Sequence, residues 1–187
     1  MKNYEKNLKI LQESHVYSKE MEHDACGVGL IASTEGKKSR KVVEYGINAL
    51  KAVWHRGAVD ADGKTGDGAG IHLEIPTDFF AEKIEITGHD HDGSKICVGM
   101  IFLPRNNYEA QENARTLLES ELTKSNFSIY GWRQVPVNPK VLGEKANLTR
   151  PEITQVLFKH NDNDLTEKEL ERKIYESRRK IEKEAIK

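Results

Sequence analysis

The chain has 187 residues, a length that allows one domain or part of a larger one. Hydrophobic residues make up 37% and charged residues 32%, so the apolar positions must be concentrated in a few segments. The formal net charge of −1 argues against nucleic-acid and membrane-surface binding, which usually need a basic excess. The two cysteines, Cys26 and Cys97, are too few for a secreted disulfide scaffold and favour a reducing, cytoplasmic compartment. No apolar run approaches the ~20 residues that span a bilayer.

The first half of the chain predicts few regular elements. Residues 1–22 have the pattern of a short polar helical arm. Residues 26–34 form an apolar run with glycines at its start, which is typical of a buried strand. Residues 39–54 place apolar side chains on one stripe behind a capping serine, which predicts a helix. Residues 55–70 are rich in glycine and aspartate and predict an irregular loop, and residues 71–76 predict a second strand.

The second half alternates strands and helices. Strands are predicted over residues 95–103 and 128–137, on either side of an amphipathic helix over residues 109–124. Residues 151–158 fit either a helical turn or the start of a strand. A capping box opens a last helix over residues 166–185. Because regular βαβ repeats are not evident, the fold class predicted is α+β.

Cys26 is the strongest candidate for a catalytic residue. Residues 1–25 have no apolar core of a secretory signal, so they are either a removable leader or a structural arm. Cleavage between Ala25 and Cys26 would give one residue both a thiol and a free α-amine of pKa roughly 7.7–8.0. That amine could then take the thiol proton, as histidine does in other thiol enzymes. The alternative is a small buried core cysteine, the usual role of this residue type.

Two further features could contribute to a site. Arg56 could bind a carboxylate through its guanidinium, or it could be the C-terminal cation of the preceding helix, with Gly57 as the helix stop. The loop around Gly66, Asp67 and Gly68 lets backbone approach a ligand, so we expect it to line a pocket. The same loop matches neither a Walker A nor a dinucleotide motif, which makes a nucleotide-binding module a weak alternative. It also fails as a calcium loop, because Thr65 stands where glycine is required.

The run His89-Asp90-His91-Asp92 could be taken for a metal site. Glycines flank it, and no distant Cys/His pair completes a ligand set. A solvated hairpin tip is therefore the preferred interpretation. We expect Cys97, in an apolar run, to belong to the core.

Taken together, several motifs resemble a known family. Residues 24–29 (DACGVG), 55–58 (HRGA), 62–71 (DGKTGDGAGI) and 131–136 (GWRQVP) are similar to the start of the large subunits of bacterial glutamate synthases. The resemblance covers roughly Tyr17 to the C-terminus. It implies the class II glutamine amidotransferase domain, whose fold is the αββα sandwich of N-terminal-nucleophile hydrolases.

The resemblance also implies a mechanism and site residues. The domain would run over residues 26–187 behind a propeptide of residues 1–25. Cys26 would be the catalytic nucleophile that hydrolyses L-glutamine through a thioester, Arg56 would bind the substrate, and the 66–70 loop would shape the pocket wall. The ammonia released would aminate 2-oxoglutarate in the synthase domains, in glutamate biosynthesis.

The resemblance implies further components that this chain does not carry. The full-length protein would use FMN, an iron–sulfur cluster and a reductase small subunit that supplies electrons from NAD(P)H, whereas no cofactor or metal is expected in this chain. The Asn-Gly pair that builds the family's oxyanion hole has no match here, so we expect the chain alone to be inactive. The alternative hypothesis is a non-catalytic structural or interaction module of the same fold that keeps its leader.

Overall fold

The structure is a computed structural model, and the residues it describes are 6–7, 9–10, 13, 27–54 and 57–186. Most of the predicted helical arm lies outside this range. The chain divides into two compact units. The smaller unit comprises the chain up to Ala58 together with Asp67–Ile71, and the larger one comprises Val59–Gly66 and His72–Lys187. Each unit is described by itself.

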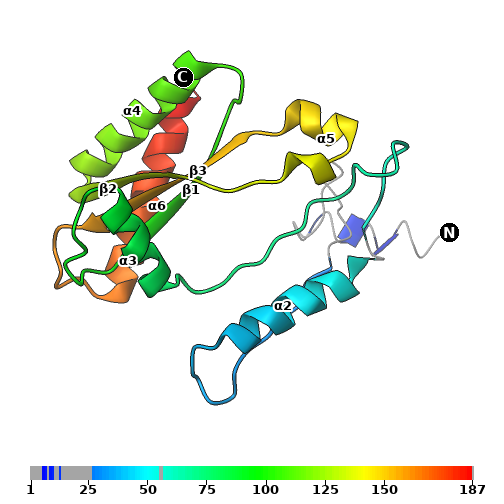
Figure 1. Ribbon diagram of the computed structural model, residues 1–187, viewed down its shortest axis with the longest axis horizontal. Coiled ribbons are helices and arrows are strands. Elements are labelled where there is room, and N and C mark those ends of the chain that lie inside the picture. Colours follow the sequence, from blue (N-terminus) through cyan, green and yellow to red (C-terminus); the bar gives the residue numbers. More distant parts are fainter. Residues whose placement is uncertain (1–5, 8, 11–12, 14–26, 55–56, 187) are drawn as a thin grey trace. The chain divides into compact units, whose positions relative to one another are not determined.

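The smaller unit contains the helix α2, Arg40–Ala52 (Figure 1). Ser39 is the cap that the sequence predicts, and its side chain accepts a hydrogen bond from the backbone N–H of Lys41. The predicted strand over residues 26–34 is wrong for the described part, because residues 27–33 belong to no strand. An extended segment becomes a strand only when a neighbouring strand satisfies its backbone groups. The side chains of Val28 and Leu30 are accordingly 92% and 89% exposed.

The larger unit is built on a three-stranded antiparallel sheet of order β1-β3-β2 (Figure 1). The strands are β1 (Cys97–Leu103), β2 (Phe127–Gln134) and β3 (Glu152–His160). The two strand predictions in this region are confirmed, and the segment left open over residues 151–158 is the central strand. Because β3 is paired on both edges and covered on both faces, its middle residues are all buried, and they do not alternate in polarity.

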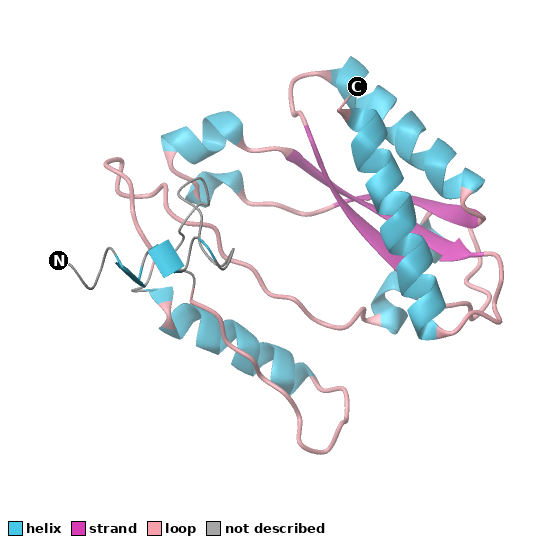
Figure 2. Cartoon of the chain, turned by 180° about the vertical axis from the view of Figure 1, so that it is seen from behind, coloured by secondary structure: helices cyan, strands magenta, loops and turns pink. Residues whose placement is uncertain are grey.

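Helices cover both faces of this sheet. The helices α4 (Tyr108–Lys124) and α6 (Glu167–Ala185) lie side by side over one face (Figures 1 and 2), and both confirm predicted helices. The capping box predicted for α6 is present between Thr166 and Glu169. The core under these two helices contains Cys97, Leu118, Leu122, Phe127, Val156, Phe158 and Leu170. Cys97 is thus the core residue that the sequence predicts.

The opposite face of the sheet packs against α3 (Thr77–Ile86), a helix that the sequence analysis did not predict. Its core contains Phe80, Ile84, Ile96, Tyr130 and Leu157. The predicted strand over residues 71–76 is wrong, because these residues belong to no strand and end at Pro76, the N-cap of α3. Asp78 in the first turn was a local signal of this helix start.

Two short elements between β2 and β3 were also not predicted. They are the 3₁₀ turn η2 (Pro139–Val141) and the six-residue helix α5 (Glu144–Thr149). The mixture of helices and an antiparallel sheet agrees with the α+β class. No helix among the described residues is long and apolar enough to cross a membrane.

Candidate functional site

The structure describes only some of the predicted site residues. Cys26 and Arg56 lie outside the described residues, so their predicted roles stay predictions. The helix next to Arg56 ends at Ala52, and its C-cap Val53 donates its backbone N–H to the carbonyl of Ala49. The prediction that Gly57 stops this helix is therefore wrong. The backbone N–H of Gly57 donates instead to the carbonyl of Trp54, in a separate turn.

The predicted pocket loop is described, and it is tied down by local bonds. A carboxylate oxygen of Asp67 accepts the backbone N–H of Ala58 at 2.8 Å, and the Asp67 N–H donates to the Ala58 carbonyl at 3.3 Å. Gly66 forms an isolated antiparallel bridge with Val59. A β-carbon on Gly68 would meet no atom within 4 Å, so its surroundings are open. A pocket-wall role for Gly66, Asp67 and Gly68 stays a prediction.

Residues 59–66, here called the Asp62 loop, are organised around one carboxylate. Oδ1 of Asp62 accepts the backbone N–H groups of Lys64 and Thr65 at 2.9 and 2.6 Å. Oδ2 accepts the Thr65 hydroxyl at 2.5 Å. Aspartate favours this local turn because its short side chain reaches backbone groups two and three residues ahead. These bonds, the Thr65 hydroxyl foremost, hold the pKa of Asp62 well below its ordinary range.

The Asp62 loop docks on the start of α5, about eighty residues later in the chain. The backbone N–H of Glu144 adds a hydrogen bond to Asp62, and the N–H of Ala146 donates to the Thr65 hydroxyl at 3.4 Å. The ammonium of Lys145 lies 2.7 Å from a carboxylate oxygen of Asp60. The acidic loop therefore meets the positive end of a short helix.

Gly143 makes this docking possible. A β-carbon there would overlap with the Thr65 hydroxyl and backbone nitrogen and with the Asp62 carboxylate. Its own φ is −69°, a value that any residue adopts, so the reason for glycine here is space and not backbone conformation. In the sequence, Asp60 and Asp62 resemble only the start of a calcium loop, which Thr65 rules out. The Asp-x-x-Thr spacing was a signal for the local turn, but nothing local could indicate α5 as its partner.

The segment His89–Asp92 is not a metal site among the described residues, where no cluster of three or more ligating side chains occurs. The predicted hairpin tip is wrong as well, because the segment connects α3 to β1. Asp92 forms an ion pair with Lys159 and accepts a hydrogen bond from the Tyr130 hydroxyl at 3.2 Å. The bond from Lys159 and, after it, the hydrogen bonds from Ser94 hold the pKa of Asp92 well below its ordinary range. Burial raises the pKa of Tyr130 to about 12.

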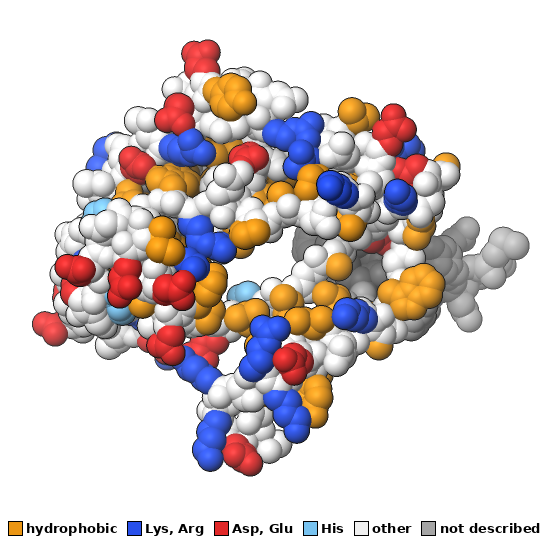
Figure 3. Space-filling view, in the orientation of Figure 1, with side chains coloured by type: hydrophobic (Ala, Val, Ile, Leu, Met, Phe, Trp, Pro, Cys, Tyr) orange, Lys and Arg blue, Asp and Glu red, His pale blue; other side chains and the backbone are white. Residues whose placement is uncertain are grey.

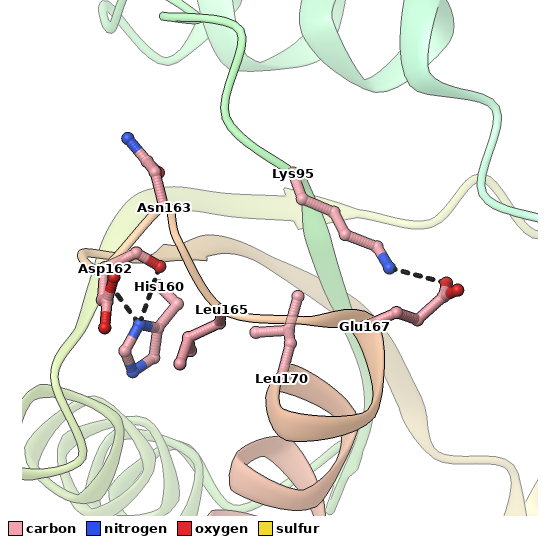
Figure 4. Close-up of a pocket in the computed structure, with 7 residues that line it drawn as sticks. All are labelled: Lys95, His160, Asp162, Asn163, Leu165, Glu167 and Leu170. Atoms are coloured by element: carbon pink, nitrogen blue, oxygen red, sulfur yellow. Dashed lines mark hydrogen bonds and ion pairs between the residues drawn. The ribbon is translucent and has the colours of Figure 1, made fainter.

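A pocket of about 220 Å³ lies where β3 turns into α6 (Figure 4). Lys95 and Glu167 form an ion pair of 2.9 Å across one side of it. On the other side the ring of His160 turns back on its own loop, and its Nδ1 accepts the backbone N–H of Asp162 at 3.0 Å. Leu165 and Leu170 line the space between. The ion pair and the His160 turn thus bond most polar groups of this lining locally, whereas Nε2 of His160 is buried and forms no hydrogen bond with the described residues.

The surface charge is mixed. Figure 3 shows basic and acidic side chains interspersed over the visible face. Most ion pairs of α6 join residues three or four apart on the exposed side of the helix, such as Arg172 with Glu176 at 3.5 Å. Such pairs are solvated surface contacts and indicate no ligand.

Comparison with known proteins places this geometry in context. Residues 26–187 match the family described as glutamine amidotransferases class-II. The chain is 51% identical over 181 residues to the glutamate synthase [NADPH] large chain of Azospirillum brasilense, covering 97% of this chain and 12% of that one. It is 40% identical over 167 residues to the ferredoxin-dependent glutamate synthase 1 of Arabidopsis thaliana, covering 87% and 10%. It is 39% identical over 158 residues to a ferredoxin-dependent glutamate synthase 2 of Synechocystis, covering 84% and 10%. The chain therefore spans about an eighth or less of the length of these relatives.

Proposed function

The chain belongs to the class II glutamine amidotransferases, and from this membership we propose that it is the glutamine-hydrolysing part of a glutamate synthase. The observation that carries the proposal is where the family match begins. It starts at residue 26, the cysteine that the sequence analysis selects as a nucleophile. A domain whose mature first residue is its catalytic group would begin its family similarity at that residue.

The proposed chemistry uses the thiol and the α-amine of Cys26. The free α-amine of Cys26 takes the thiol proton, and the thiolate attacks the side-chain amide carbon of L-glutamine. The carbon–nitrogen bond then breaks, the amine returns its proton to the nitrogen, and ammonia leaves a glutamyl thioester. Water, deprotonated by the same amine, cleaves the thioester to release glutamate and restore the thiol. Arg56 is proposed to bind a carboxylate of the substrate, because a guanidinium recognises carboxylates through paired hydrogen bonds.

The structural part of the proposal concerns the larger unit. Its antiparallel sheet with α4 and α6 on one face would be one sheet layer and one helix layer of the proposed αββα sandwich. The Asp62 loop, bound to α5, ends at Gly66 and is followed by Asp67 and Gly68. We propose Gly66, Asp67 and Gly68 as a wall of the glutamine pocket. The ammonia would pass to synthase domains like those of the relatives, which are several times longer than this chain.

The cofactors of such a synthase would bind elsewhere. An iron–sulfur cluster is held by cysteine thiolates, commonly four, and this chain has two cysteines. One of them, Cys97, is buried in the core, and burial raises its pKa to about 11, so it is a poor ligand. We therefore propose that the cluster is held outside these residues. FMN and the contacts with an electron-supplying reductase subunit are proposed for the synthase domains as well.

The test replaces the nucleophile in the full-length protein. A Cys26→Ala variant should lose glutamine-dependent glutamate formation to background and keep the ammonia-dependent reaction, because ammonia bypasses the hydrolytic step. Cys97→Ala is the matched control, since it also removes a thiol but should keep glutamine-dependent activity in the folded protein. A Cys26→Ala variant that consumed glutamine at the parental rate would refute the assignment.

The intact mass of the mature protein separates this proposal from a non-catalytic module. A chain that starts at Cys26 supports the nucleophile, because only that form has the free α-amine beside the thiol. A chain that retains residues 1–25 and hydrolyses no glutamine would favour the structural module. Retention of the leader together with full hydrolysis would exclude the α-amine as the base.

A further inference from the structure

A second pocket of the larger unit lies where the first turns of α4 meet the ends of β2 and β3. It is open and has a volume of about 450 Å³, large enough for a small metabolite. Gln111 and Thr154 lie deep in its lining, with 6% and 4% of their surfaces exposed. Trp132 and Tyr108 supply aromatic surface, and the charged lining residues used below are Arg105, Arg115 and Glu152.

Most polar groups in this lining already have partners, which fixes the geometry of the pocket. The Gln111 amide donates to the carbonyls of Pro104 and Arg105 at 2.9 and 3.3 Å, and so holds the backbone that carries the Arg105 side chain. The indole N–H of Trp132 donates to Glu119 at 2.6 Å, and this bond orients the ring. The Arg115 guanidinium lies over that ring, with its central carbon 5.6 Å from the ring centroid.

The groups without a partner share one property. The Nε–H of Arg115 and the hydroxyl of Thr154 are buried and form no hydrogen bond with the described residues. The Arg115 guanidinium is paired through Nη1 with Glu112 at 2.5 Å, so Nε–H is the donor of Arg115 that the proposal uses. The guanidinium of Arg105 has no hydrogen bond or ion pair with the part of the chain that the structure describes. All three can donate hydrogen bonds, and two of them carry positive charge. A buried donor left unpaired destabilises the fold, so a ligand that accepts hydrogen bonds from it would be bound favourably here.

We propose that this pocket, whose lining belongs wholly to the larger unit, binds the carboxylate group of a small molecule. A carboxylate offers two acceptor oxygens, which suit the Arg105 and Arg115 guanidinium groups. Glu152 favours a carboxylate over a phosphate as the bound anion. It lies in the lining with one oxygen bonded to the Gln134 amide at 2.5 Å, and its negative charge repels a phosphate dianion more than a carboxylate monoanion. The inference does not depend on glutamine hydrolysis.

Trp132 provides a direct measurement in the 187-residue chain. The chain has two tryptophans, so a Trp54→Phe variant leaves Trp132 as the only indole. Titration with acetate at constant ionic strength should change its fluorescence saturably, with a dissociation constant on the order of millimolar, as expected for one small anion. Chloride should produce no saturable change, and phosphate should bind more weakly than acetate.

Variants of the lining test whether acetate binds in this pocket. Arg105→Gln should weaken acetate binding about tenfold or more, since a hydrogen bond to a charged group is lost. Arg172→Gln removes an exposed arginine of α6 and should leave the titration unchanged. If Arg105→Gln does not fold by circular dichroism, Thr154→Val removes the buried hydroxyl with little change in size and should also weaken binding. The proposal is wrong if acetate does not saturate, if phosphate binds more tightly, or if neither folded lining variant weakens acetate binding.

Discussion

Gly143 lies where the Asp62 loop meets α5, and the space around it does not accommodate a β-carbon. Gly143→Ala should therefore push Thr65 and Asp62 away from α5 and lower the free energy of unfolding by about 1–3 kcal/mol. Urea denaturation of the two proteins measures this difference. Gly29→Ala is the control, because a β-carbon at Gly29 meets no atom within 4 Å and should cause no loss of stability. Equal stability of both variants would mean that the loop is not docked as described.

Cys97 illustrates how burial controls the reactivity of a single residue. It is 4% exposed, and desolvation raises the pKa of its thiol from the ordinary 9.0 to about 11. Near pH 8 only about a thousandth of such thiols would be the reactive thiolate. In a Cys26→Ala background, Cys97 should thus react with a disulfide reagent at least about a hundredfold more slowly in the folded chain than in urea. Fast labelling of the folded chain would contradict its place in the core.

At the scale of elements, sequence reasoning succeeded where the determinants are local. The helices α2, α4 and α6 carry apolar stripes, and the caps predicted for α2 and α6, Ser39 and Thr166, accept backbone N–H groups in the structure. The cap of α4, Asn107, was not predicted. Strand prediction was less complete, because a strand needs a partner that its own residues do not encode. The segments 27–33 and 71–76 have strand-like composition but no pairing, and β3 was ambiguous because burial on both faces removes alternation.

The capping box of α6 is an element-level device whose contribution can be measured. Thr166 Oγ1 accepts the Glu169 N–H at 3.4 Å, and the Glu169 carboxylate accepts the Thr166 N–H at 2.9 Å. Thr166→Ala should destabilise the chain by about 1 kcal/mol, whereas Thr116→Ala, at an exposed position within α4, should not. Denaturant midpoints of both variants test this. A loss at Thr116 equal to that at Thr166 would show that the cap has no special role.

The same cap makes the stability of the chain depend on pH. The hydrogen bonds from Thr166 lower the pKa of Glu169 below its ordinary 4.5. A group with a lowered folded-state pKa contributes stability that is present above its unfolded pKa and is lost as the pH falls. The difference in stability between the parent and Thr166→Ala should therefore be full near neutral pH and should shrink below pH 4.5. A difference that grew on acidification would contradict the bond between Thr166 and Glu169.

For the whole molecule, the motifs indicated the family before any geometry, and the match over residues 26–187 confirms it. The sequence also predicted that residues 57–70 are irregular. It could not predict that Asp62 and Thr65 bind the start of α5, because that contact joins segments about eighty residues apart. Nor could it predict the donors gathered around Thr154, which belong to α4, β3 and the turn between β1 and α4. Local patterns indicate elements and families, whereas sites assembled from distant segments require the fold.

The two units should differ in local stability. The larger unit has two cores on either side of its sheet, and Leu157 in β3 is 0% exposed. In the smaller unit none of the described residues is buried, and α2 has 13 residues, a length at which an isolated helix is marginal. Backbone amides of α2 should therefore show hydrogen-exchange protection at least about a hundredfold lower than those of β3 in the 187-residue chain. Equal protection in α2 and β3 would mean that α2 opens only when the sheet unfolds, and would contradict a separate smaller unit.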